Sequence, residues 1–482
     1  MRLADVAGAV GAPVRGDAGV SVREVAYDSR SVPAGAVFFC IPGAAHDGHA
    51  FAGAAVEAGA TAVVVERLLD GIAVPQVLVP SVRLAIGPMS AAVFGHPGRA
   101  MTVVGVTGTN GKTTVTYLLE SIFAGAGWRP GLIGTTGARV DREHIALDKT
   151  TPEAPDLHRL LAEMRTAGVQ AIAMEVSSHA LDQHRSDGLV LDLAVFTNLS
   201  QDHLDLHGSM EAYFAAKARL FTPTMARGAV VNGDDTWGRR LLGEASIPCR
   251  TFALDTAADV RADEVVIDDR GARFRIGARR ITTPMRGRFN VSNALAALAV
   301  ADGLGIDPDQ ADAAIGGVGL VPGRMEAIEG GQRFLVVVDY AHTPDSIQHV
   351  LRGARPLTAG RVIVVFGCGG DRDRAKRSQM GRAATSRADL TVITSDNPRS
   401  EDPSAIIAEI ERGAREGGGA YTIEADRRRA IRAALVEARD GDVVVIAGKG
   451  HESTQETGGE LAPFDDRIVA REELAALLGG TS

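Results

Sequence analysis

The sequence predicts an α/β protein of several domains, and three observations support this expectation. Short valine-rich apolar runs alternate with alanine- and leucine-rich stretches of helical length along the whole chain. Aromatic residues make up only 4% of the 482 residues, so most of the 45% apolar content comes from Ala, Val and Leu. A chain of this length is too long for a single core, so we expect two to four domains. Alternating strands and helices of this kind are typical of parallel sheets covered by helices.

The first part of the chain extends to a Pro-Gly break at His96-Pro97-Gly98. Before this break, apolar runs predict strands at 36–41, 60–65 and 76–79 and a helix over 82–94. We therefore expect a first domain over residues 1–97.

The second part is predicted to extend to the break at Val321-Pro322-Gly323-Arg324, which gives a central domain over 98–323. Its expected elements are strands at 101–106, 171–175, 193–197 and 229–232, helices over 112–124, 211–220 and 291–303, and a polar β-rich stretch over 250–281. The last domain, 324–482, has predicted strands at 334–339, 362–366, 390–394 and 443–447 with helices between them, which indicates another parallel sheet.

The charge and the cysteines narrow the class of protein. Lys and Arg number 51 and Asp and Glu 60, which gives a formal charge of −9 and argues against a protein that coats nucleic acid. Three widely separated cysteines show no metal-ligand spacing and indicate a reducing compartment. The N-terminus lacks an apolar signal core, and no apolar run reaches about 18 residues. We expect a cytoplasmic protein without membrane insertion, as a monomer or weak oligomer.

A glycine-rich loop between a predicted strand and a predicted helix is the strongest local signal. It has Val106 where the general phosphate-loop pattern has a glycine. Glycine N–H groups, a helix N-terminus and a lysine favour phosphate binding, and a threonine hydroxyl can bind Mg²⁺. The predicted ATP-binding residues are Gly108, Thr109, Asn110, Gly111, Lys112, Thr113 and Thr114.

Further blocks follow in a fixed order. They include Glu175-Val176-Ser177-Ser178-His179, Asp202-His203-Leu204-Asp205-Leu206-His207, Lys217 with Leu220-Phe221, Phe289-Asn290-Val291-Ser292-Asn293, Pro322-Gly323-Arg324, and Asp339-Tyr340-Ala341-His342. With the glycine-rich loop, this series closely resembles the Mur ligases, which build the peptidoglycan stem peptide. It is most similar to the members that add the third residue. The resemblance implies a UDP-binding N-terminal domain, a central phosphate-loop ATPase and a C-terminal Rossmann-like domain that brings the amino acid.

The resemblance also implies a reaction. ATP would phosphorylate the D-Glu carboxylate of UDP-N-acetylmuramoyl-L-Ala-D-Glu, and an amine would attack the acyl phosphate. Catalysis is expected from Lys112, Lys217, Glu175, His207 and Arg324. The metal residues would be Thr113, Glu175, His207 and Lys217, with two Mg²⁺ ions and a CO₂-derived carbamate on Lys217. By sequence alone, Lys217 is an ordinary surface lysine of a helix, and His203 is as well explained by a structural role.

Other residues are assigned to ligands by the same resemblance. Asn293, Arg324 and Asp339 would contact ATP. The UDP-linked substrate would be held by Tyr27, Ser29, Ala44, Ala45, His46, Thr150, Thr151, Ser177, Gln183 and Arg185. The amino acid would be held by Arg372, Asp396, Asn397, Pro398, Arg399, Gly448 and Glu452.

The amino-acid residues follow three predicted strands, at the ligand-binding edge of a parallel sheet. The stretch Asp396-Asn397-Pro398-Arg399 resembles that of the family members specific for meso-diaminopimelate, which implies that this is the amino acid added. An arginine can bind its distal carboxylate, and Glu452 or Asp396 its ammonium group. Three alternatives remain open: a lysine-adding ligase of the same family, a folylpolyglutamate synthase, and a non-catalytic ATP-binding switch. Arg399 argues against the first, the N-terminal loops against the second, and the joint presence of Glu175, His207, Lys217 and Arg324 against the third.

Overall fold

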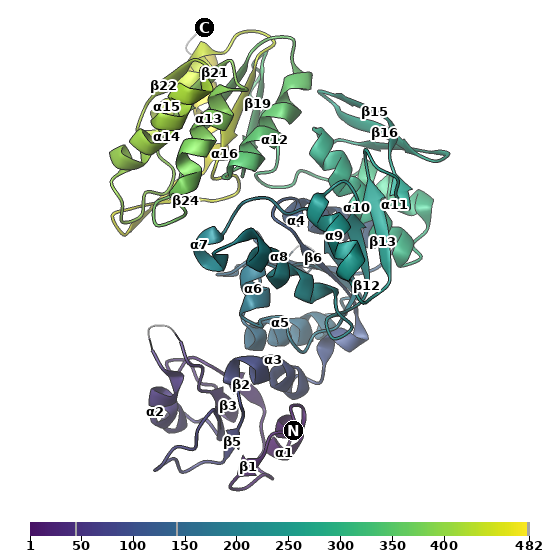
Figure 1. The fold of residues 1–482 in the computed structure, drawn as a ribbon, viewed down its shortest axis with the longest axis vertical. Coiled ribbons are helices and arrows are strands. Elements are labelled where there is room, and N and C mark those ends of the chain that lie inside the picture. The colour runs from purple at the N-terminus through teal and green to yellow at the C-terminus, as the bar shows by residue number, and fades with distance from the viewer. Residues whose placement is uncertain (44–45, 141–142, 480–482) are drawn as a thin grey trace.

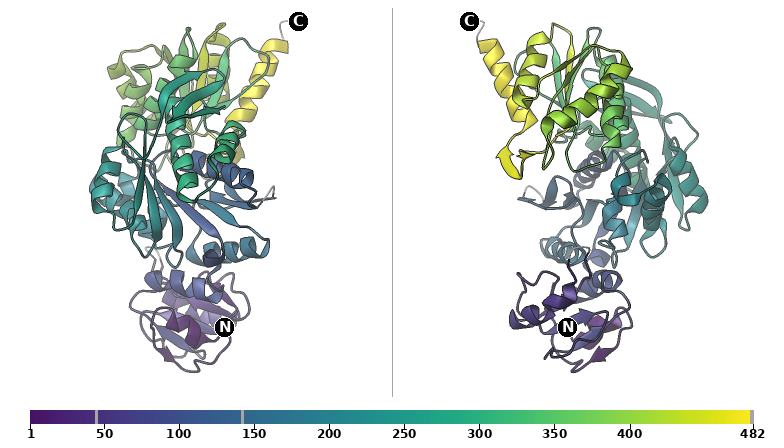
Figure 2. Two further views of the ribbon diagram at one scale, coloured as in Figure 1. Left: turned by 90° about the vertical axis from the view of Figure 1, so that its right-hand side faces the viewer. Right: turned by 60° about the vertical axis from the view of Figure 1, so that its left-hand side comes forward.

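The computed structural model describes residues 1–43, 46–140 and 143–479. Three α/β parts follow one another along the long axis of the molecule, in chain order (Figures 1 and 2). The expected α/β class with three parts is confirmed, because each part has its own main sheet. None of the described helices is long and apolar enough to cross a membrane.

The N-terminal part contains a five-stranded sheet in the order β1-β5-β4-β3-β2. The strands from β2 to β5 are parallel, and β1 is antiparallel to β5. Their bounds are β1 Val14–Arg15, β2 Glu24–Ala26, β3 Ala36–Phe39, β4 Ala62–Val65 and β5 Gln76–Leu78. The helices are α1 Leu3–Gly8, α2 Ala52–Glu57 and α3 Val82–Val93. Ser81 caps α3 by accepting the N–H of Leu84, and α3 packs against α5 (Ala154–Thr166) of the central part.

The central part contains a nine-stranded sheet in the order β14-β13-β12-β11-β6-β10-β7-β8-β9. It is parallel from β14 to β7, and β8 and β9 add an antiparallel edge. The strands are β6 Thr102–Thr107, β7 Pro130–Gly134, β8 Gly137–Val140, β9 Glu143–Ile145, β10 Ala171–Glu175, β11 Leu191–Phe196, β12 Ala226–Asn232, β13 Cys249–Ala253 and β14 Val260–Arg261. A separate antiparallel sheet contains β15 Asp263–Asp268, β16 Gly271–Ile276 and β17 Arg279–Thr283.

Alternate residues of the central strands face two cores, as the period of a strand requires. Val104 and Val106 pack under α4 (Lys112–Gly125), α10 (Arg288–Gly303) and α11 (Pro308–Gly316). Val103 faces the opposite core. That core is covered by α5, α6 Ser178–Asp182, α8 Met210–Ala218 and α9 Thr236–Glu244, while the short α7 spans Leu204–His207.

The C-terminal part contains a six-stranded sheet in the order β18-β19-β23-β20-β21-β22, parallel except for β18. The bounds are β18 Glu326–Ala327, β19 Leu335–Asp339, β20 Val362–Phe366, β21 Leu390–Ile393, β22 Tyr421–Ile423 and β23 Val443–Ala447. One face is covered by α12 Pro344–Ala354, α13 Ala375–Thr385 and α14 Pro403–Gly417, the other by α15 Arg427–Glu437 and α16 Asp466–Gly479. A hairpin of β24 Thr454–Thr457 and β25 Glu460–Pro463 completes it.

The strands and helices expected from apolar runs are present, with ends that differ by up to three residues. The sequence did not reveal the short or polar elements, among them β7 to β9, β18, β22 and the β24–β25 hairpin. The strand β7 was missed because Pro130, Gly131 and Gly134 interrupt its apolar pattern. The polar stretch 250–281 proved to contain both the edge of the central sheet and most of a separate antiparallel sheet.

Candidate active site

The phosphate loop follows β6, which lies between β10 and β11 in the central sheet. Gly108 and Gly111 have φ values of 146° and 89°, which favour glycine. A Cβ at Gly108 would lie 1.9 Å from Thr197 Oγ1, so only glycine fits there. Asn198 fastens the loop, because its carbonyl accepts the N–H of Thr109 at 2.9 Å and its Oδ1 that of Asn110 at 3.0 Å. Val106 is paired with Glu175 and Val195 inside the sheet, which explains why no glycine is needed at that position.

Two lysines share one carbonyl oxygen of this loop. Lys112 Nζ donates to Gly108 O at 3.0 Å and to Thr109 O at 2.9 Å, and Lys217 Nζ donates to the same Gly108 O at 3.0 Å. Lys217 is only 1% exposed, with its Nζ 4.7 Å from the centre of the Tyr213 ring. Burial, and then the neighbouring Lys112, hold the pKa of Lys217 well below its usual value. Lys217 is thus not the surface lysine that its helix suggested, and the loop is poised to receive anions.

Glu175 ends β10 beside the loop and is 1% exposed. Its two oxygens accept the N–H of Thr135 at 2.9 Å and the hydroxyl of Thr135 at 3.0 Å. Thr113 Oγ1 accepts Arg324 Nη2 at 3.0 Å. Within the described residues no group of three His, Cys, Asp or Glu side chains could hold a metal by itself. A carboxylate and a hydroxyl fit Mg²⁺, which is usually held by few protein oxygens together with water and substrate phosphates.

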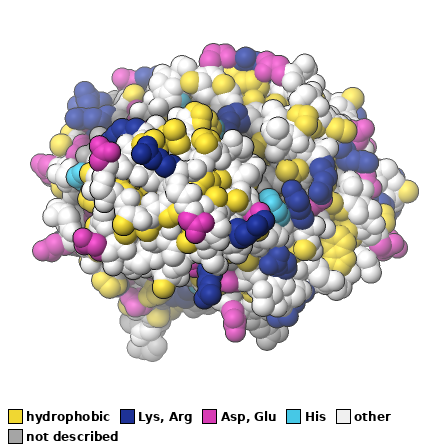
Figure 3. Space-filling model, turned by 90° about the horizontal axis from the view of Figure 1, so that it is seen from below, with side chains coloured by type: hydrophobic (Ala, Val, Ile, Leu, Met, Phe, Trp, Pro, Cys, Tyr) yellow, Lys and Arg dark blue, Asp and Glu magenta, His cyan; other side chains and the backbone are white. Residues whose placement is uncertain are grey.

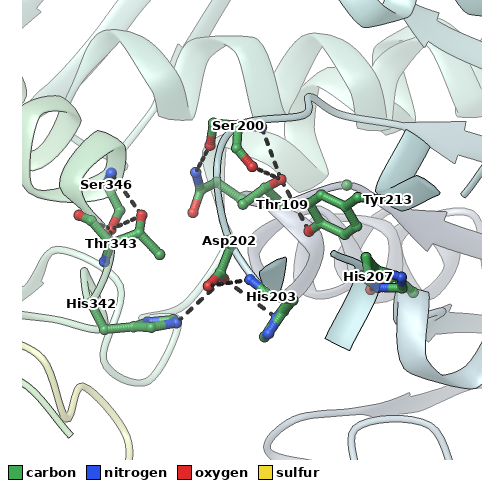
Figure 4. A network of polar contacts seen from close by, with 12 residues as sticks. Thr109, Ser200, Asp202, His203, His207, Tyr213, His342, Thr343 and Ser346 are labelled. Atoms are coloured by element: carbon green, nitrogen blue, oxygen red, sulfur yellow. Dashed lines mark hydrogen bonds and ion pairs between the residues drawn. The ribbon is translucent and has the colours of Figure 1, made fainter. Parts of the chain in front are cut away.

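A histidine cluster lies near Tyr213 and Thr109 of the phosphate loop, whose hydroxyl groups are in contact (Figure 4). His207 Nε2 is 3.0 Å from Ser178 Oγ, and its ring stacks on Tyr213 at 4.9 Å. Asp202 lies between two histidines, 3.3 Å from His203 Nε2 and 3.8 Å from His342 Nε2. Burial lowers the pKa of His203 to about 3, so this ring is neutral at pH 7. His203 lies between Asp202 and His179, whose ring centre is 4.8 Å away.

The segment after Gly323 joins the central and C-terminal parts. The Arg324 guanidinium stacks on the Tyr340 ring at 4.6 Å while it donates to Thr113. Asp339 accepts the N–H of Met325 at 2.8 Å and that of Ala341 at 2.9 Å, so both oxygens brace this segment. Asn110 Nδ2 donates to Asp345 Oδ2 at 3.4 Å and adds a second connection to the C-terminal part.

Asn293 of α10 lies against the phosphate loop. It is 8% exposed, and its Nδ2 donates to Asn290 Oδ1 at 3.1 Å. A Cβ at Gly111 would be 2.5 Å from Asn293 Oδ1, which shows how closely the amide approaches the glycine.

The residues expected at the muramoyl-dipeptide form one cluster at the end of β10. Thr151 Oγ1 donates to Glu175 O at 2.9 Å and accepts the Ser177 N–H at 3.1 Å. Arg185 is 8% exposed, donates to Thr151 O at 3.4 Å and pairs with Glu153 at 2.9 Å. Arg185 also contacts Gln183, and Thr150 Oγ1 contacts Thr135 Oγ1.

The N-terminal residues are less closely gathered. Tyr27 donates its hydroxyl to Asp156 Oδ2 of α5 at 2.6 Å, and burial and this contact raise its pKa. Ser29 is half-buried next to the exposed pair of Asp28 and Arg30. His46 is exposed, and its ring is nearly perpendicular to that of Phe51, with the ring centres 6.2 Å apart. Ala44 and Ala45, which were expected in the same loop, lie outside the described residues.

The loops after β20, β21 and β23 meet at one edge of the C-terminal sheet. Asn397 Nδ2 donates to Glu452 Oε2 at 2.8 Å. Lys449 is fully buried, and its Nζ donates to Asn397 Oδ1 at 3.0 Å and to Glu452 Oε2 at 3.3 Å. The same Nζ is 3.8 Å from Asp396 Oδ1. Burial, and then the neighbouring Asp396, raise the pKa of Glu452.

The two arginines of this edge flank Gly369. Arg399 has a left-handed backbone, with φ 53°, and its Nη1 donates to Gly370 O at 2.6 Å. Arg372 is exposed and donates to Asp371 O at 3.2 Å. A Cβ at Gly369 would be 3.0 Å from Arg399 Nη1 and 3.9 Å from Arg372 Cγ. Close packing also positions Pro398 and Gly448. A Cβ at Gly370 would clash with Pro398 O, and a Cβ at Gly448 (φ 117°) would clash with the Asp396 carboxylate.

Sequence reasoning missed several residues that hold these loops. Arg427 and Asp466 form a fully buried ion pair at 2.7 Å. Arg427 also donates to Ser395 O at 3.2 Å and to Ala447 O at 2.9 Å, which joins the ends of β21 and β23. Neither residue carries a local signal, because their contact spans 39 positions. Lys449, by contrast, lies directly after Gly448, which was predicted to bind the amino acid, and its burial could have been suspected from its neighbours Gly448 and Gly450.

Comparison with known proteins decides the family. The chain matches the Mur ligase middle domain over residues 106–301 and the glutamate ligase domain of Mur ligases over 323–450. Residues 21–86 match the catalytic domain of the Mur ligase family. It is 45% identical to a UDP-N-acetylmuramoyl-L-alanyl-D-glutamate–2,6-diaminopimelate ligase of Streptomyces avermitilis, over 99% of this chain and 97% of the relative. A ligase of the same name from Gloeobacter violaceus is also 45% identical, with 98% of each chain covered.

The chain belongs to the Mur ligase family.

Solved structures agree with this Mur ligase assignment. A UDP-N-acetylmuramoyl-L-alanyl-D-glutamate–2,6-diaminopimelate ligase superimposes with a TM-score of 0.72 and 34% identity, over 99% of this chain and all of that one. A folylpolyglutamate synthase of Mycobacterium tuberculosis shares the fold at a TM-score of 0.63, but only 18% identity and 82% of this chain. The resemblance seen in the sequence motifs is thus confirmed, and the membership makes the chain an ATP-dependent amide-forming ligase.

Proposed function

We propose that this Mur ligase joins meso-diaminopimelate to the D-Glu carboxylate of UDP-N-acetylmuramoyl-L-Ala-D-Glu, with release of ADP and phosphate. One observation carries the proposal: a cluster of both charge signs, Arg399 with Lys449, Asp396 and Glu452, at the edge that follows β21 and β23. The distal end of a diamino acid with two carboxylates carries a negative carboxylate and a positive ammonium group. The relatives with this activity in their names match nearly the whole chain.

In the proposed mechanism, the phosphate loop holds the ATP phosphates through its N–H groups and Lys112. Phosphoryl transfer to a carboxylate brings two anions together, so positioning and positive charge contribute most. Arg324 reaches the loop from the C-terminal side, through Thr113, and adds charge where the γ-phosphate would lie. Bound Mg²⁺ would neutralise phosphate charge there, with Thr113 and Glu175 as its protein ligands. The D-Glu carboxylate oxygen takes the phosphoryl group, and the incoming amine then displaces phosphate from the acyl carbon.

Lys217 is proposed to act as a carbamate. Its pKa is held well below the usual value by burial, so the neutral amine that can attack CO₂ is more populated than in an exposed lysine. Addition of CO₂ to this neutral amine forms an N–C bond and releases one proton. Counted from the protonated lysine, two protons are lost, and a cation becomes an anion. This change would remove the repulsion between Lys217 and Lys112, which now share Gly108 O, and supply an oxygen ligand for a second Mg²⁺, with His207 nearby as a further contributor.

The remaining assignments complete the proposal. Residues 1–97 would receive the UDP end, with Tyr27, Ser29 and His46, and the cluster of Thr150, Thr151, Ser177, Gln183 and Arg185 would hold the dipeptide. Residues 98–323 would bind ATP, and residues 324–482 the amino acid. These substrates are water-soluble nucleotides and amino acids, which supports a cytoplasmic reaction. The proposal also keeps the expected monomer or weak oligomer.

ADP release tests the function. The protein is incubated with ATP, Mg²⁺, the UDP-muramoyl-dipeptide and a panel of amino acids, and ADP is measured with each component omitted in turn. We expect ADP only when all three substrates are present, and fastest with meso-diaminopimelate. Release that ignores the amino acid would favour an ATP switch. Release in a parallel reaction in which a folate replaces the UDP-muramoyl-dipeptide would favour a folylpolyglutamate synthase.

A further inference from the structure

One carboxylate beside the amino-acid loops has no role in the proposed mechanism. Glu456 lies on β24, at the lower edge of the C-terminal part in Figure 1. Its Oε2 is 3.5 Å from Arg399 Nε, and the side chains of Arg399 and Glu456 are 23% and 37% exposed. The arginine that the proposed function assigns to a substrate carboxylate therefore already has a carboxylate partner.

The backbone of β24 sets the position of Arg399 independently of that side chain. The Arg399 N–H donates to Glu456 O at 3.0 Å, and the Gly458 N–H donates to Arg399 O at 2.7 Å. The Glu456 N–H donates to Asn397 Oδ1 at 3.1 Å. These contacts maintain the left-handed backbone of Arg399, which a non-glycine residue adopts only when its surroundings enforce it. Loss of the Glu456 carboxylate leaves all of them in place.

Glu456 differs from Glu452 in how it is held. Glu452 accepts hydrogen bonds from both Asn397 and Lys449. For the Glu456 carboxylate, Arg399 is the only polar side-chain partner among the described residues. A half-exposed carboxylate with a single long contact can move away at little cost, because such surface pairs contribute about 0–1 kcal/mol.

We propose that Glu456 is a specificity-determining residue, a built-in counter-anion of Arg399 that the substrate's distal carboxylate must displace. This inference rests on the proposed function. With meso-diaminopimelate, the ligand carboxylate replaces Glu456 at Arg399, so part of the binding free energy is spent on the exchange. With L-lysine, which has no distal carboxylate, Glu456 stays on Arg399 and spares it from being left unpaired. Glu456 thus weakens discrimination between the two amino acids.

The variant Glu456→Gln tests this role. Without the competing anion, kcat/KM for meso-diaminopimelate should rise about two- to fivefold, the range of a partly exposed ion pair. The value for L-lysine should not rise, so the ratio between the two amino acids widens. A merely structural role would leave kcat/KM unchanged or lower it. Glu456→Ala should shift the ratio in the same direction. This second variant keeps the test valid if Glu456→Gln does not fold.

The matched control is Glu460→Gln on β25 of the same hairpin. Glu460 is exposed and pairs through its backbone with Thr457, so the substitution makes the same charge change away from Arg399. It should leave both kcat/KM values unchanged. If the wild-type enzyme turns over meso-diaminopimelate but neither Glu456 variant has a higher kcat/KM for it, the proposed role of Glu456 is wrong and the proposed function stands. A wild-type enzyme that fails to use this amino acid overturns the proposed function and the inference with it.

Discussion

The phosphate loop and the amino-acid loops occupy the same kind of place, the carboxyl ends of parallel strands, yet they balance charge differently. At the phosphate loop, Lys112 and Lys217 converge on one carbonyl oxygen. At the amino-acid loops, Lys449 already contacts Asn397 and Glu452, and Arg399 already contacts Glu456. The first region is organised to receive anionic phosphates, and the second to exchange partners with a ligand of both signs.

This difference predicts that single charges matter more at the phosphate loop. Substitution of Lys112 removes a cation without an opposite charge bound to its Nζ, whereas the charges of the amino-acid loops are already paired with one another. The surface at the N-terminal end shows no comparable separation of charges, because basic, acidic and apolar side chains are interspersed there (Figure 3).

The largest effect is expected for Lys112→Ala. The charge of Lys112 meets phosphate in both the ground and transition states, so ligation should fall about 10³-fold or more. Steady-state ADP release measures the effect, and a circular dichroism melt checks that the variant is folded. Near wild-type turnover in a folded variant would refute the ATP-site assignment.

Lys217 should rank next and respond to the sign of the charge. Lys217→Ala should lose about 10²-fold in rate and regain part of it with added acetate or formate, which can take the place of the carbamate. Lys217→Arg should remain inactive, because it restores a cation where an anion is required. Activity in Lys217→Arg would rule out the carbamate.

Substitution of Arg399 should affect one substrate only. In Arg399→Ala, KM for meso-diaminopimelate should rise by about 10- to 100-fold, while KM for ATP stays the same. Arg374→Ala is the control, since Arg374 is exposed and pairs with Glu409 on α14. Equal changes in the two KM values would indicate that the variant has lost structure in general, and not specifically its binding of the diaminopimelate carboxylate.

The smallest effect is expected outside both regions, at His158 between the N-terminal and central parts. Burial lowers the pKa of His158 to about 4, so between pH 6.5 and 4 the unfolded state binds a proton that the folded state does not. Stability from this residue is therefore present above pH 6.5 and lost on acidification, by at most about 1.4 kcal/mol per pH unit.

The variant His158→Gln keeps a donor for Asp187 O, which lies 3.1 Å from His158 Nε2. Its melting temperature should fall less than that of the wild type between pH 6.5 and 5. Identical pH dependence in the two proteins would show that His158 titrates normally in the folded state.

The two regions also differ in how far the sequence could predict them. The phosphate loop is contiguous, so its glycines, lysine and threonines are readable in one stretch. The amino-acid loops come from three strand ends, and their contacts depend on the buried pair Arg427–Asp466 and on the hairpin of Glu456, which no local pattern reveals. The sequence also could not show that Asp339 is engaged by two backbone N–H groups, since that depends on how the segment after Gly323 folds back.

A competition experiment tests the central claim most directly. The protein is supplied with ATP, Mg²⁺, UDP-N-acetylmuramoyl-L-Ala-D-Glu and equal amounts of meso-diaminopimelate and L-lysine, and the products are separated by mass. The account predicts that the diaminopimelate adduct dominates, with one ADP formed per amide bond. Equal incorporation of lysine would contradict the specificity, and ADP formed without either adduct would contradict the ligase itself.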